Sequence, residues 1–112
     1  MIKVKIESKD GGRQLLLEMN GHANDGKDGA IICSAASTLA YTLAQNVRDM
    51  EQVGKLKKPA KITLSDGSAR ILCMPRAEHV PIATVYFHAI KRGFDLLVAN
   101  YPDYVQLNAE NI

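Results

Sequence analysis

Cysteine is scarce in this sequence, because only Cys33 and Cys73 occur among its 112 residues. Two cysteines in a chain without a secretion signal do not form the disulfide framework of a small extracellular domain. They are also too few, and too far from any pair of histidines, for a zinc site with standard ligand spacing. Each thiol is therefore interpreted singly, and we expect neither a metal nor another cofactor.

Long apolar runs are also absent. No stretch approaches the roughly 20 apolar residues that a membrane-spanning helix requires. The first residues, Met1–Lys9, alternate charged and apolar side chains and lack the apolar core of a signal peptide. We therefore expect a cytoplasmic protein without a membrane partner.

A strong net charge is missing as well, because the formal charge is only +2. This value is too small to indicate a nucleic-acid-binding protein. A mild basic cluster contains Lys55, Lys57, Lys58 and Lys61. No aromatic residues interleave with it, which favours a solvated turn over an RNA-facing surface. We expect no requirement for nucleic acid.

Apolar residues are plentiful, at 46% of the chain, and predict one packed domain over residues 1–112. Strands are predicted by alternating apolar side chains and by short apolar runs. Turn signals at Asp10-Gly11-Gly12 and Asp66-Gly67 separate them. The expected strands are Ile2–Ile6, Gln14–Met19, Lys61–Leu64, Ala69–Met74 and Tyr104–Leu107.

Three- and four-residue apolar spacing predicts two amphipathic helices. The first runs from about Ile32 to Val53 and is closed by Gly54, and the second runs from about His79 to Ala99. The order is therefore ββαββαβ. It indicates an α+β fold, with one sheet of about five strands and both helices packed on one face.

The loop expected between Asn20 and Gly29 separates His22 from Cys33. At the start of a helix, free backbone N–H groups and the helix dipole would stabilise a thiolate at Cys33. If the loop folds back, His22 could meet this nucleophile, and the N–H groups from Ser34 onward could hold an oxyanion. On spacing alone a plainer interpretation is favoured, in which Cys33 is a small buried residue and His22 a surface residue.

The surrounding residues have two interpretations each. Gly26 and Gly29 suit either a loop that closes over an extended peptide or a tight turn. Asp25 or Asp28 could orient His22, although solvated loop acids are the commoner case. The Ser37 hydroxyl could bond back to a helix carbonyl or contact substrate. Cys73, in contrast, lies in an expected strand and is best interpreted as a core thiol.

Two motifs together resemble the Prp family, the bacterial ribosomal-processing cysteine proteases. They are Gly21-His22-Ala23 and, after a glycine-containing loop, Ile32-Cys33-Ser34-Ala35-Ala36-Ser37. The resemblance extends over nearly the whole chain, including Gly93–Leu97 and Tyr101–Val105. One departure is Ala30, at the position where most members carry an acid directly before the Ile/Val-Val/Ile-Cys step; the nearest acid here is Asp28.

The resemblance implies an endopeptidase that removes a short N-terminal extension from a large-subunit ribosomal protein, and a homodimer. Its catalytic residues would be Cys33 and His22. The residues expected in the substrate-binding loop and its surroundings are Gly21, Ala23, Gly26, Asp28, Gly29, Ser34 and Ser37. Three alternatives stay open: a non-catalytic ribosome-associated binding module, a protease for a phage structural protein, and a structural dimer in which Cys33 is buried and unreactive.

Overall fold

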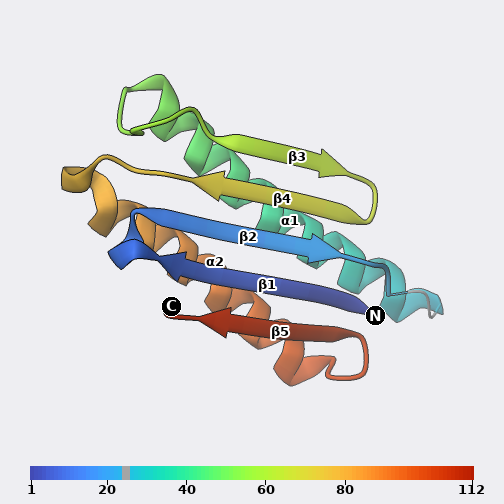
Figure 1. The fold of residues 1–112 in the computed structure, drawn as a ribbon. Coiled ribbons are helices and arrows are strands. Elements are labelled where there is room, and N and C mark those ends of the chain that lie inside the picture. Colours follow the sequence, from blue (N-terminus) through green and yellow to red (C-terminus); the bar gives the residue numbers. More distant parts are fainter. Residues whose placement is uncertain (24–25) are drawn as a thin grey trace.

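The computed structural model describes residues 1–23 and 26–112. Its centre is one five-stranded sheet with the strand order β3-β4-β2-β1-β5 (Figure 1). The strands are β1 (Ile2–Lys9), β2 (Gln14–Asn20), β3 (Lys61–Ser65), β4 (Ser68–Cys73) and β5 (Val105–Glu110). Neighbouring strands are antiparallel except β1 and β5, which run parallel. The expected α+β fold with the order ββαββαβ is confirmed.

Two helices, α1 (Gly26–Gln52) and α2 (Val80–Asn100), cover the same face of this sheet (Figure 1). Short 3₁₀ turns at Asp10–Gly12 and Ala77–His79 complete the fold. Alternation along β1 directs Ile2, Val4 and Ile6 toward the helices, and all three are buried.

The core forms where these strand side chains meet the apolar stripes of both helices. The largest fully buried side chains from the helices are Phe87, Phe94, Ile32 and Leu43. Burial of each such side chain stabilises the fold by roughly 1.5–3 kcal/mol before entropy costs. Within the described residues, no helix has the length and hydropathy needed to cross a bilayer.

The start of α1 differs from the expectation. The helix begins at Gly26 and not near Ile32, so Gly29 lies inside the helix and not in an open loop. Gly26, the first residue of α1, has a left-handed φ of +59°. Gly29 is buried. Of the expected loop, Asn24 and Asp25 lie outside the described residues.

One end of the sheet carries the residues of interest. There β1 begins, β2 ends, the β3–β4 turn closes, and the first turns of α1 lie beside them (Figure 1). The opposite end carries the β1–β2 turn and the segments that precede β3 and follow β4. His22 and Cys33 therefore reach the same end of the molecule from different elements.

Candidate active site

Cys33 lies on α1, about two turns after its first residue. Its side chain is half-buried and packs against the edge of the hydrophobic core. The thiol is therefore neither sealed in the core nor fully exposed, in contrast to Cys73 in β4, which is completely buried. An accessible sulfur at the rim of a core is suited to react with an incoming ligand.

This position overturns the expected role of the helix start. Only the first four N–H groups of a helix are free, so the N–H groups of Cys33 and Ser34 are committed to backbone hydrogen bonds inside α1. The dipole effect also falls off within the first turn. Neither a thiolate at Cys33 nor an oxyanion is therefore held by the N–H groups that the sequence suggested.

The main chain after β2 provides a different partner for the thiol. The backbone N–H of Ala23 donates to Cys33 Sγ at 3.3 Å, and the Ala23 carbonyl oxygen lies 3.9 Å from the same sulfur. An N–H that points at the sulfur stabilises a thiolate there, while the carbonyl can accept from the neutral thiol. This contact joins the two sequence motifs, because Ala23 follows His22 directly.

His22 is exposed, and its imidazole lies against the two-residue turn between β3 and β4. A Cβ built at Gly67 would overlap Nε2 and Cε1 of this ring. The adjoining backbone is fixed to the same turn, because the Gly21 N–H donates to the Gly67 carbonyl at 2.9 Å. Within the described residues, no hydrogen bond joins the imidazole to the Cys33 thiol.

Gly21 occupies a position that only glycine fits. Its φ is +106°, and a Cβ there would run into the carbonyl oxygen of Met1. The Met1 nitrogen in turn donates to the His22 carbonyl at 2.7 Å. The segment that carries His22, just after β2, is thus held on one side by the start of β1 and on the other by the β3–β4 turn.

The other expected site residues lie on different faces of α1. Gly29, Cys33 and Ser37 are four residues apart and share one face, so Gly29 and Ser37 flank the thiol. Asp28 is exposed in the first turn of the helix, and five residues correspond to about 140° of rotation from Cys33. Its carboxylate therefore projects away from the thiol.

Ser34 is exposed, and its carbonyl accepts a hydrogen bond from the Thr38 hydroxyl at 2.8 Å. In the described part of the chain, the hydroxyls that bond back to a helix carbonyl in α1 belong to Thr38 and Thr42, and not to Ser37. The half-buried Ser37 hydroxyl therefore keeps its donor for another partner beside the thiol.

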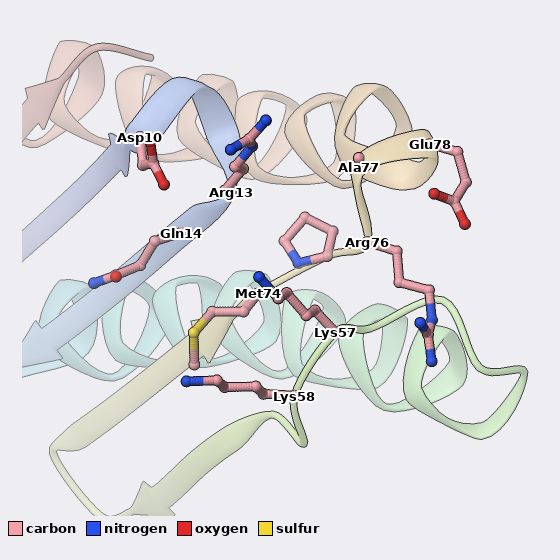
Figure 2. Close-up of a pocket in the computed structure, with 10 residues that line it drawn as sticks. Asp10, Arg13, Gln14, Lys57, Lys58, Met74, Arg76, Ala77 and Glu78 are labelled. Carbon is pink, nitrogen blue, oxygen red and sulfur yellow. The ribbon is translucent and has the colours of Figure 1, made fainter.

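No cluster of three or more His, Cys, Asp or Glu side chains suited to a metal occurs among residues 1–23 and 26–112. A pocket of about 560 Å³ lies along α1 and is lined in part by Ser34 and Ser37. Another, of about 520 Å³, lies at the opposite end of the sheet (Figure 2). Its charged lining consists of Arg13, Lys57, Lys58, Arg76, Asp10 and Glu78. Since neither Cys33 nor His22 lines this pocket, we assign the site from its chemistry and not from cavity size.

Comparison with known proteins identifies the family. The family model described as "Cysteine protease Prp" matches residues 1–106. The chain belongs to this family of cysteine proteases. No curated protein matches the sequence.

Solved structures similar to this chain share its fold. One is the essential ribosomal processing protease Prp from S. aureus with a covalently linked product peptide, at 22% identity and a TM-score of 0.68, covering 97% of this chain and 99% of the other. The structure of the same enzyme with a substrate peptide has 21% identity and a TM-score of 0.67, and the match covers 97% of this chain and 99% of the other. The structure of SMU.848 from Streptococcus mutans has 24% identity and a TM-score of 0.68, and the match covers 98% of this chain and 94% of the other.

One residue of the site was missed by sequence reasoning. Gly67 was recognised only as part of a hairpin turn, because its Asp-Gly sequence is typical of such turns. Its contact with His22 depends on the pairing of β2 with β4, 48 residues apart at Asn20 and Ser68. No local pattern reports a contact between residues so distant in sequence.

Proposed function

We propose that this protein is an endopeptidase in which Cys33 is the nucleophile and His22 the general base and acid. The observation that carries the proposal is the contact of Cys33 Sγ with the backbone N–H of Ala23. It brings the half-buried thiol beside the residue that follows His22, in a chain that belongs to a family of cysteine proteases.

The proposed reaction begins when His22 takes the thiol proton of Cys33. The thiolate attacks the scissile carbonyl, the C–N bond breaks, and the amine leaves with the proton from His22. Water, deprotonated by His22, then attacks the thioester. The C–S bond breaks, the carboxylic acid is released, and the sulfur regains a proton.

As substrate we propose the precursor of a large-subunit ribosomal protein, from which a short N-terminal extension is removed in the cytoplasm. The proposal is supported by the family and by the fold shared with the S. aureus ribosomal processing protease, which was solved with substrate and product peptides. We further propose that the enzyme is a homodimer and requires no nucleic acid.

The test is mass spectrometry of the purified precursor after incubation with the enzyme. We expect wild type to release the extension, and Cys33→Ala to leave the precursor intact with an unchanged fold. Cys33→Ser should retain little activity, because an alcohol is far less ionised than a thiol. Cys73→Ala is the matched control, since it removes the other thiol of the chain, and we expect it to cleave.

The outcomes separate the proposal from its alternatives. A wild-type protein that binds the precursor without cutting it is a ribosome-associated binding module. Cleavage of a phage structural protein, with the ribosomal precursor left intact, would change the substrate but not the chemistry. Cleavage that survives in Cys33→Ala would remove Cys33 from the mechanism.

A further inference from the structure

The turn between β3 and β4 is a surface of the site to which sequence reasoning assigned no function. It consists of Asp66 and Gly67, between the paired residues Ser65 and Ser68. We propose that Gly67 is a positioning residue for His22: the imidazole rests on the bare backbone of this glycine, which orients the ring for its reaction with Cys33. This inference rests on the proposed function.

The His22 ring contacts Gly67 closely, and one edge of the ring makes the contact. Among the ring atoms, Nε2, Cε1 and Cδ2 lie nearest to the position that a Cβ of Gly67 would occupy. The edge that carries Nε2 therefore faces the turn. Nδ1 is not among these three nearest atoms.

The thiol lies beside that same main chain. Cys33 Sγ is 3.3 Å from the Ala23 nitrogen, which is bonded to the carbonyl carbon of His22. Nδ1 is the ring nitrogen nearer to the main chain, whereas Nε2 lies at the far edge of the ring. An imidazole held on Gly67 through its Nε2 edge thus leaves Nδ1 as the nitrogen that exchanges a proton with the thiol.

The turn is itself fixed to the end of β2 and to Gly21, directly before His22. The Gly21 N–H donates to the Gly67 carbonyl, and the Ser68 hydroxyl donates to Asn20 Oδ1 at 3.1 Å. Because both elements are joined by these bonds, the ring rests on a support that moves together with its own backbone. An exposed histidine would otherwise occupy several rotamers, few of which direct a nitrogen at the sulfur.

The test compares Gly67→Ala with Gly54→Ala. Both glycines have positive φ, +73° and +74°, so alanine introduces similar backbone strain at each. A Cβ at Gly54 meets nothing within 4 Å, whereas a Cβ at Gly67 overlaps the His22 ring. The pair therefore separates displacement of the imidazole from general loss of stability.

We expect Gly67→Ala to lower kcat by about 10²-fold with little change in KM, because the reacting groups are misplaced while the peptide still binds. Gly54→Ala should keep wild-type kcat. Equal kcat values in the two variants, or a higher kcat in Gly67→Ala, would overturn the inference. A wild type that cleaves nothing would instead reject the proposed function.

A second measurement does not depend on activity. In wild type we expect a nuclear Overhauser effect between the His22 ring protons and the α protons of Gly67. The melting temperature of Gly67→Ala should fall further than that of Gly54→Ala, and this excess should vanish when both are made in a His22→Ala background. An excess that persists without the imidazole would mean that the ring does not rest on Gly67.

Discussion

The two thiols of the chain differ in their surroundings, and this difference determines which of them can react. Cys33 is half-buried and contacts the main chain at Ala23, whereas Cys73 is completely buried in β4. Burial raises the pKa of the Cys73 thiol from 9.0 to about 12, because the surrounding core disfavours the thiolate. Cys73 therefore stays protonated at any pH at which the enzyme works, as expected for a core thiol.

The raised pKa of Cys73 predicts a loss of stability at alkaline pH. Below pH 9 the thiol is neutral in both the folded and the unfolded chain. Above pH 9 only the unfolded chain releases the proton, so the free energy of unfolding should fall by about 1.4 kcal/mol per pH unit until about pH 12. Urea unfolding between pH 8 and 11 measures this loss.

The control for this prediction is Cys73→Val, which keeps an apolar side chain in the core but cannot ionise. Lysine and tyrosine titrate in the same range in both proteins, so only the difference between them reports Cys73. The wild type should lose stability more steeply than Cys73→Val above pH 9. Parallel curves would show that the thiol ionises equally in both states.

The strands and helices were largely predictable from sequence, because apolar residues recur along each at a regular spacing and these residues form the core. The start of α1 was not, since Gly26 and Gly29 have low intrinsic helix propensity and favoured a loop. Tertiary packing favours a helix over this segment despite its glycines, because Gly29 is buried in the first turns of α1. This one shift changes the environment of Cys33 from a helix start to a helix interior.

The contact between the helices depends on Gly93 of α2. A Cβ at this position would lie 2.5 Å from Cδ2 of Leu39 on α1. We expect Gly93→Val to lower the free energy of unfolding by about 1–3 kcal/mol, because it overfills the space between the helices. Ala89→Val, at an exposed position of the same helix, controls for the helix propensity of valine.

Urea unfolding of the double variant tests the mechanism of this prediction. Replacing Leu39 by Ala removes the side chain that the new valine meets. Gly93→Val should therefore cost less in the Leu39→Ala background than in wild type, a coupling that double-mutant cycles detect. Additive effects of the two substitutions would show that Gly93 and Leu39 act independently.

At the scale of the whole molecule, the sheet brings together residues that sequence reasoning treated separately. The sequence and the family resemblance indicated His22 and Cys33 as a pair, and the structure brings both to one end of the sheet. The support of His22 by Gly67, and the N–H of Ala23 at the thiol, depend on strand pairing and on the position of α1. Such contacts between distant residues leave no periodic signal in one sequence.

The outer surface of the helical layer carries exposed apolar side chains. Ile31 and Tyr41 on α1 are 58% and 49% exposed, and Val85 and Leu96 on α2 are 59% and 65% exposed. Ala36, by contrast, is buried in the chain's own core, so the small residues of α1 are partly used within one chain. An apolar outer face is the kind of surface that a homodimer covers.

We therefore expect the chain to sediment at twice the mass of a single chain, with the helical layers of two copies in contact. Tyr41→Glu should convert the dimer to a monomer in sedimentation velocity experiments, because a charge would be buried without a partner in the interface. Thr63→Glu, on the exposed face of β3 away from the helices, is the charge-matched control and should remain dimeric. A dimer that persists in Tyr41→Glu but dissociates in Thr63→Glu would place the interface on the sheet.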